Sequence, residues 1–250
     1  MNALILVSVL PILLLYLGLY KAKSILLPVT LLGLLVAAGL AIWHWGAPAF
    51  PVYYGMMVFD HFSMAFSAVS ILSTMLILML SKGYFERISD HVAEYYAIIL
   101  FALAGIIVMV SYHNLTMLFI GIEIMSVSLY ILAGIKKQDF ASNEAALKYF
   151  LMGAFSTGLM LMGIALIYGG NPIGSFNINM LALGTGKMPV MIAAGLVLLV
   201  VSMSFKVSAA PFHFWAADVY DGAPTVFTSF MATIVKIAGF IAFIRLFQVS

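Results

Sequence analysis

Long apolar runs separated by short polar stretches dominate the sequence. Eight runs are long enough to cross a membrane as helices, since about 20 residues span a hydrocarbon core of about 30 Å. Helices are expected at 2–20, 24–45, 61–82, 93–112, 114–135, 143–168, 189–220 and 224–248. The pattern therefore predicts an all-α, polytopic transmembrane bundle of about eight helices.

The seventh run, 189–220, is too long for one straight crossing and contains Pro211. Proline has no backbone N–H, so the carbonyl of Val207 would lose its helical partner. We therefore expect a broken seventh helix, interrupted between about Val207 and Phe212. Unwound backbone within a membrane is tolerated only where it is buried in protein or lines a wet cavity.

The stretches between the runs are short, with two exceptions. Segment 46–60 contains Pro48, Pro51 and two tyrosines, and we expect an interfacial loop there. Segment 169–188 contains the turn signals GGNP and GTG and is expected to be the one long loop. The first run is not preceded by a basic region, so we expect a retained helix rather than a cleaved signal peptide.

Composition explains what surrounds these helices. Hydrophobic residues make up 65% of the chain and charged residues 8%, whereas a soluble domain has roughly 45–50% and 25%. The lipid bilayer is therefore the expected solvent. The absence of cysteine excludes disulfides, thiolate metal sites and iron–sulfur clusters in this chain. No basic cluster suggests nucleic acid, and no nucleotide loop or catalytic triad appears, so no cofactor is expected in this chain.

Loop charges predict how the bundle lies in the membrane. The loops after the first, third and fifth helices carry six basic residues, whereas those after the second, fourth and sixth carry only Lys187. The positive-inside rule then places the first set in the cytoplasm and the amino terminus outside. The basic residues are Lys21, Lys23, Lys82, Arg87, Lys136 and Lys137.

Three ionisable residues lie far from any predicted loop: Glu123, Lys206 and Lys236. A charge at bilayer depth costs at least about 2.5–3.5 kcal/mol, so such residues face the bundle interior and are usually functional. A buried lysine can also exchange protons near neutrality. The alternatives are a structural carboxylate for Glu123, a snorkelling side chain for Lys206 and an interhelical tie for Lys236.

Two further residues are weaker candidates. Lys148 follows Glu144 by four positions, so a solvated helical ion pair is as good an interpretation as a channel role. His213 follows Pro211, and histidine is the residue type whose charge changes most readily near physiological pH, which suits a relay. A lone histidine is nevertheless more often a satisfied core residue. Asp218 and Asp221 are expected to serve in capping and turn formation.

Three stretches carry a family resemblance. SFKVSAAPFHFWAADVYDGAPTVFTSFMATIVKIAGF, HNLTMLFIGIEIMSVSLYILAG and NEAALKYFLMGAFSTG resemble the antiporter-like membrane subunits of respiratory complex I. These subunits are related to those of multisubunit cation/proton antiporters. The resemblance covers roughly residues 90–248, whereas the first three helices match only in hydropathy. It implies three leading helices in 1–90 and a five-helix proton-translocating unit in 91–250.

The resemblance also implies roles for single residues. Glu123 and Lys206 match a charge pair, Lys148 and Lys236 match channel lysines, and His213 matches a histidine near the helix break. Family members carry two inverted five-helix units, and the second unit, with its terminal lysine, is absent from these 250 residues. We expect either a truncated or divided form of the sequence, or a second half-channel that lies elsewhere.

The expected function is therefore that of a proton-translocating subunit of NADH–quinone oxidoreductase in a bacterial inner membrane. Its expected partners are other membrane subunits of complex I in a hetero-oligomer. NADH, FMN, iron–sulfur clusters and a quinone would be used by other subunits. Two alternatives are a subunit of a multisubunit cation/proton antiporter and a non-transporting membrane scaffold.

Overall fold

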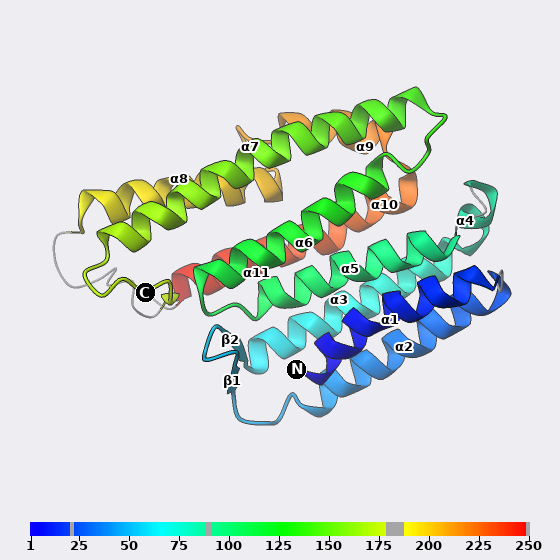
Figure 1. Cartoon of the computed structure of the whole chain (residues 1–250), viewed down its shortest axis with the longest axis horizontal. Helices are drawn as coiled ribbons and strands as arrows, with labels where there is room; N and C mark the ends of the chain where they lie inside the picture. Colours follow the sequence, from blue (N-terminus) through cyan, green and yellow to red (C-terminus); the bar gives the residue numbers. More distant parts are fainter. Residues whose placement is uncertain (21–22, 89–91, 179–187, 249–250) are drawn as a thin grey trace.

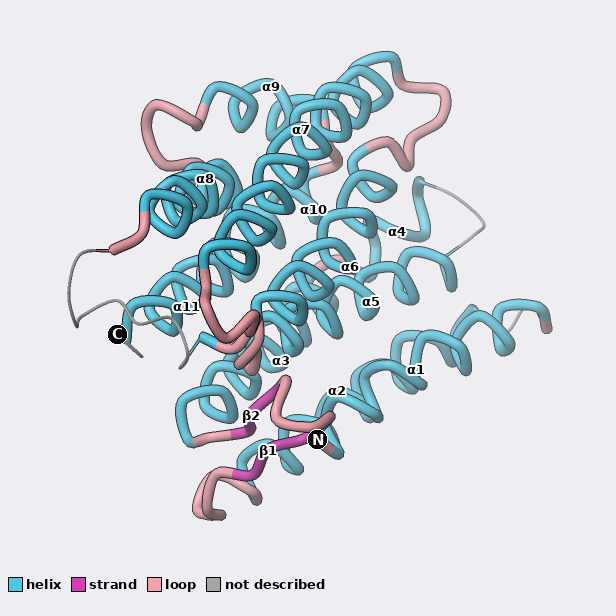
Figure 2. Tube along the Cα trace, turned by 60° about the vertical axis from the view of Figure 1, so that its left-hand side comes forward, coloured by secondary structure: helices cyan, strands magenta, loops and turns pink. Residues whose placement is uncertain are grey.

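Helices running back and forth along one direction make up most of the computed structural model (Figures 1 and 2). It describes residues 1–20, 23–88, 92–178 and 188–248. Within these residues eight helical spans are long and apolar enough to cross a membrane. The first seven are α1 (Asn2–Leu19), α2 (Lys23–Trp43), α3 (His61–Leu80), α5 (Val92–Val110), α6 (Leu115–Ala133), α7 (Phe140–Gly170) and α8 (Val190–Val207).

The eighth span is one continuous helix with an irregular middle. It consists of α10 (Thr225–Phe230), a π-helical turn (Met231–Val235) and α11 (Lys236–Gln248). Two short helices complete the helical part, namely α4 (Lys82–Ile88) and α9 (Phe214–Gly222). The fold is the expected all-α transmembrane bundle, and the number of spans confirms the prediction from hydropathy.

Helix α5 lies at the centre of the bundle. Its sequence is apolar nearly all round, which is typical of a helix buried on every side, and 83% of its span is buried. Its closest neighbours are α6 and α1, while α7 pairs with α8 on the other side of α6. Because α1 packs directly on α5, the leading helices share one core with the rest, and the division into 1–90 and 91–250 stays a prediction.

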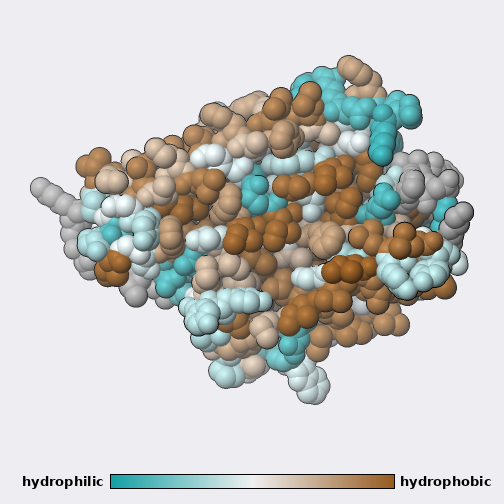
Figure 3. All heavy atoms as spheres, viewed as in Figure 1, coloured by the Kyte–Doolittle hydropathy of each residue, from teal (hydrophilic) through white to brown (hydrophobic). Residues whose placement is uncertain are grey.

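The outer surface of the bundle agrees with a lipid surrounding. The face in Figure 3 is mostly hydrophobic across its middle, with hydrophilic residues gathered at the end where α7 begins. The connections after α1, α3 and α6 lie at one end of the bundle, opposite the β-hairpin and both termini (Figure 1). This alternation agrees with the loop charges, but which end faces the cytoplasm stays a prediction.

The break in the seventh predicted helix is confirmed. Helix α8 ends at Val207 and α9 begins at Phe214, with Pro211 in the non-helical segment between them. Ser208 caps α8 in the left-handed region, with φ 57°. The N–H groups of Ser208 and Ala209 turn back to the carbonyls of Phe205 and Ser204. The helix therefore ends at Val207, the residue whose carbonyl Pro211 could not have satisfied.

The prediction of a plain loop at 46–60 was wrong. Strands β1 (Phe50–Val52) and β2 (Met57–Phe59) form an antiparallel hairpin, with Pro51 opposite Val58. Pro51 is tolerated because not every backbone N–H of a strand at the edge of a sheet donates a hydrogen bond to a neighbouring strand. Strand β2 in turn bonds to the α5–α6 connection, where the N–H of Val58 donates to the carbonyl of Ser111. The long loop expected at 169–188 lies partly outside the described residues.

Candidate functional site

Lys206 lies in the last turn of α8 and is the most deeply buried lysine side chain among those predicted to act. It is 5% exposed. Its ammonium group donates to the hydroxyl of Ser126 at 3.0 Å and to that of Tyr130 at 3.3 Å, both on α6. A buried ammonium without such acceptors would be costly. The two hydroxyls therefore hold Lys206 in the interior rather than at a surface.

Glu123 shares a helix face with these two hydroxyl residues. Ser126 and Tyr130 follow it by three and seven positions, the spacing of one face of an α-helix. Among the described residues Glu123 forms no ion pair within 4.0 Å, and its Oε1 is buried without a hydrogen-bond partner. The structure thus brings Glu123 and Lys206 to the same face of α6 without a direct ion pair, so their role as a charge pair stays a prediction.

Lys236 reaches the helix break from the other side. It stands at the start of α11 and donates to the carbonyl of Lys206 at 3.3 Å and to the hydroxyl of Ser208 at 2.5 Å. The last carbonyls of an α-helix have no partner within the helix, and a cation is favourable there. Lys236 therefore caps the helix that carries Lys206. The two lysines are connected through the backbone carbonyl of Lys206, which accepts from the Lys236 ammonium.

Aromatic rings enclose this cap. The ring of Trp215 stacks on Tyr149 at 4.7 Å and on Phe205 at 5.2 Å, and its Nε1 donates to the Phe205 carbonyl at 3.0 Å. The Lys236 ammonium lies 4.8 Å from the centre of the same Trp215 ring, within the range of a cation–π contact. The ring of Trp215 therefore contacts both the end of α8 and the Lys236 ammonium, which it provides with a polarisable neighbour.

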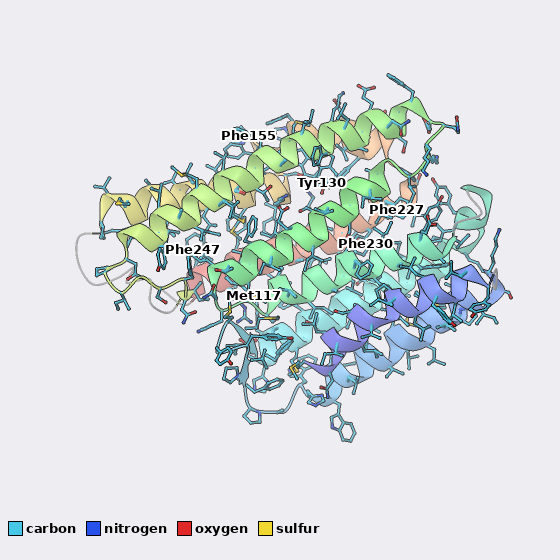
Figure 4. All side chains as sticks on the ribbon, viewed as in Figure 1. Met117, Tyr130, Phe155, Phe227, Phe230 and Phe247 are labelled. Atoms are coloured by element: carbon cyan, nitrogen blue, oxygen red, sulfur yellow. The ribbon has the colours of Figure 1, made fainter. Side chains whose placement is uncertain are left out.

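A glycine lets α7 approach the site. Tyr130 points from α6 toward α7 (Figure 4), and a Cβ atom at Gly153 would lie 2.1 Å from its hydroxyl oxygen. The Tyr130 ring also packs edge-on against Tyr149 at 4.8 Å. The bare backbone at Gly153 therefore provides the space that the Tyr130 hydroxyl needs in order to face Lys206.

Lys148 lies apart from this cluster. Its ammonium group contacts Glu144 at 2.9 Å and Asp218 at 2.6 Å, and all three side chains are well exposed. The solvated helical pair was one of the two interpretations, and the structure adds the link to α9. The prediction of a capping or turn role for Asp218 was wrong, because this residue lies within α9 and pairs with α7. A channel role for Lys148 stays a prediction.

His213 stands at the start of α9, where it is exposed. Its side chain forms no hydrogen bond to any described residue, so its relay role also stays a prediction. The described part of the chain holds no group of three His, Cys, Asp or Glu side chains placed to bind a metal ion.

Four residues of the site were not predicted: Ser126, Tyr130, Ser208 and Trp215. A signal existed for two of them, because Ser126 and Tyr130 lie at helical spacing from Glu123. Ser208 and Trp215 belong to a stretch that carries the family resemblance, which gave them no role. The contacts of both depend on how the chain turns after Val207.

Comparison with known proteins decides the family. The family model described as NADH:quinone oxidoreductase/Mrp antiporter matches residues 111–250, which is more than half of the chain. The chain belongs to this family. The match includes α6, α7, α8 and the eighth span, and therefore every residue of the site described above.

Curated proteins and solved structures that resemble this chain agree with the family assignment. Subunit N of the NADH-quinone oxidoreductase from Cytophaga hutchinsonii is 43% identical over 97% of this chain and 52% of its own length. A chain in the structure of respiratory complex I from Thermus thermophilus with bound aureothin has a TM-score of 0.84 and 34% identity. That match covers 97% of this chain and 52% of the other.

A more distant structure shares the fold alone. A chain of the Mrp complex from Dietzia sp. has a TM-score of 0.81 at 18% identity, covering 98% of this chain and 49% of that chain. This chain spans about half the length of the curated relatives it matches.

Proposed function

We propose that this chain acts in proton translocation as a membrane subunit of NADH-quinone oxidoreductase similar to subunit N. The observation that carries the proposal is the buried ammonium of Lys206, held by two hydroxyls beside a helix break that Lys236 caps. The similarity to the Cytophaga hutchinsonii and Thermus thermophilus proteins supports the choice of complex.

The arrangement suits a proton switch. The hydroxyls that hold the Lys206 ammonium are neutral. When the lysine loses its proton, no charged hydrogen-bond partner is left unpaired. Glu123, one turn away on the same face of α6, favours the ammonium form when it approaches. A small movement between α6 and α8 would therefore change whether Lys206 holds or releases its proton. In this proposal, Lys236 receives or supplies protons through the cap, and Lys148 and His213 serve at the edges of the path.

The surroundings follow from the same proposal. Redox chemistry with NADH, FMN, iron–sulfur clusters and quinone takes place in other subunits, and this chain acts without a cofactor. It lies in a bacterial inner membrane as one member of a hetero-oligomer, with the amino terminus outside.

The test is a set of variants in the assembled complex. Lys206→Arg keeps the charge but cannot release a proton, so we expect proton pumping to fall at least tenfold. Lys206→Ala and Glu123→Gln should impair pumping as well, and their combination should be less than additive. Lys82→Arg, at an exposed lysine outside the site, is the matched control. Pumping is measured in membranes, with assembly followed separately on native gels.

The outcomes separate the rival functions. If Lys206→Arg pumps at the parent rate, release of a proton from Lys206 is not part of the mechanism, and the chain acts as a scaffold. A cation/proton antiporter subunit is the second candidate, supported by the family description and the shared fold of the Mrp complex. Purification of the native complex without flavin and iron–sulfur subunits would favour that candidate.

A further inference from the structure

A buried ion pair ties the last helix to the start of α3. One Nη of Arg245, on α11, donates to both carboxylate oxygens of Asp60, at 2.8 and 3.0 Å. The side chain of Arg245 is 6% exposed and that of Asp60 is 31% exposed. The guanidinium also lies 5.7 Å from the centre of the Phe62 ring. The pair therefore joins segments 185 residues apart in a largely desolvated place.

Asp60 is a fixed anchor for this contact. It is the N-cap of α3 and accepts from the N–H of Ser63 at 2.7 Å, while its own N–H donates to the Ser63 hydroxyl at 3.0 Å. The Nε of Arg245 is buried and has no hydrogen-bond partner among the described residues. The arginine therefore depends on Asp60 for most of its polar contact.

Arg245 and Lys236 lie on opposite faces of the same short helix. They are nine positions apart, and at about 100° per residue the two side chains point about 180° away from each other. Helix α11 packs against α8 and α5, and more lightly against α3. One cation thus reaches the carbonyl of Lys206, and the other reaches the cap of α3.

The segment before α11 departs from regular α-helix. The π-helical turn Met231–Val235 directly precedes Lys236, and such turns often mark functional sites within helices. The contact with α8 is tight, because a Cβ atom at Gly239 would lie 2.5 Å from a methyl group of Val207. A small shift of α11 would therefore change how Lys236 meets the end of α8.

We propose that Asp60 and Arg245 are positioning residues that form a latch, which fixes α11 against α3 and so holds Lys236 at the cap of α8. The inference rests on the proposed function, because it takes Lys236 to be part of the proton path. The hydroxyl of Tyr112, which donates to the Ala242 carbonyl at 2.9 Å, is a second tie at the same end of α11.

The test uses neutral variants in the full complex. Asp60→Asn removes the charge but keeps an N-cap acceptor, since asparagine caps helices about as well as aspartate. Arg245→Gln removes the guanidinium. We expect each single variant to lower proton pumping at least threefold in a fully assembled complex. The double variant should lose less than the product of the two single losses, because either substitution alone already removes the ion pair.

Ser63→Ala is the matched control. It removes one bond of the capping box and leaves the ion pair intact, so it should pump like the parent. If it lowers pumping as much as Asp60→Asn, a disturbance at the start of α3 is enough to cause the loss without breaking the ion pair, and the latch is refuted. Parent-like pumping in both single variants, or a double variant whose loss is the product of the two single losses, also refutes it.

Lys236→Ala measured alongside separates this inference from the proposed function. If Lys236→Ala pumps like the parent, the proposed proton path is wrong in this chain. If it is impaired while Asp60→Asn and Arg245→Gln are not, only the latch fails.

Discussion

Replacing Gly153 by alanine tests whether proton pumping depends on the hydrogen bond between the Tyr130 hydroxyl and the Lys206 ammonium. The new methyl group would lie 2.1 Å from the Tyr130 hydroxyl oxygen and 2.7 Å from its Cζ. The Tyr130 ring is held by Tyr149 at 4.8 Å and by Phe150 at 5.8 Å. It therefore has to turn away from α7, and the 3.3 Å bond to the Lys206 ammonium is lost.

The expected magnitude follows from that bond. A hydrogen bond to a charged group contributes about 1.5–3 kcal/mol, which corresponds to a factor of about 10 to 150 in the occupancy of the bound ammonium position. Alanine in a helix interior is more favourable than glycine by up to about 1 kcal/mol. We therefore expect a small change in overall stability and a large loss of proton pumping.

Two further variants isolate the cause. Gly158→Ala lies on the same helix, and a Cβ atom there meets nothing within 4 Å, so it receives the same gain in helix propensity without touching the site. Tyr130→Phe removes the hydroxyl without the steric conflict. Pumping and thermal unfolding of the purified complex are measured for all three. If Gly153→Ala and Tyr130→Phe both pump within twofold of Gly158→Ala, the hydroxyl has no role in holding Lys206.

Two other predictions concern the cap and the ion pair. Ser208→Gly should raise stability by roughly 1 kcal/mol, because glycine adopts the left-handed backbone at this position without strain. It should nevertheless lower proton pumping, because Lys236 loses a hydroxyl acceptor. A variant whose stability and pumping rise or fall together would contradict this. Burial acts to raise the pKa of Asp60, but the bonds from Arg245 and Ser63 outweigh it and hold that pKa below its usual value. The stability gained is therefore present at neutral pH and lost as the pH falls below about 4. The difference in unfolding midpoint between the parent and Asp60→Asn should shrink over that range, and a constant difference would contradict the assignment.

The sequence was sufficient for features that depend on local pattern. Hydropathy gave the eight spans because lipid leaves no other structure for long apolar runs. The break before Pro211 was predictable because the missing N–H acts within a single turn. The hairpin at 50–59 was missed because two prolines and two tyrosines in a short stretch favour an irregular loop, and the strand pairs form only against the α5–α6 connection.

Contacts between distant segments were beyond this reasoning. Arg245 stands near the end of an apolar run, where a basic residue is usually interfacial, and nothing near it in the sequence indicates Asp60. Glu123 was found because it lacks a local partner, but the groups that hold Lys206 are the hydroxyls beside Glu123 on α6. Which of several polar side chains meets a buried lysine depends on the rotation of each helix, and that rotation is set by close contacts such as the one at Gly153.

The cap on α8 links local chain chemistry to the proposed mechanism. Helix α8 ends at Val207, so the carbonyl of Lys206 is among the last carbonyls of the helix, which have no partner within it. Lys236 donates to that carbonyl, and Lys206 itself donates to α6 through its side chain. A change in the charge of Lys236 therefore acts on the backbone of the residue whose side chain is the other candidate proton carrier. In the proposed mechanism, a peptide dipole would therefore couple the buried Lys206 to the partly buried Lys236, two cations that would otherwise repel each other.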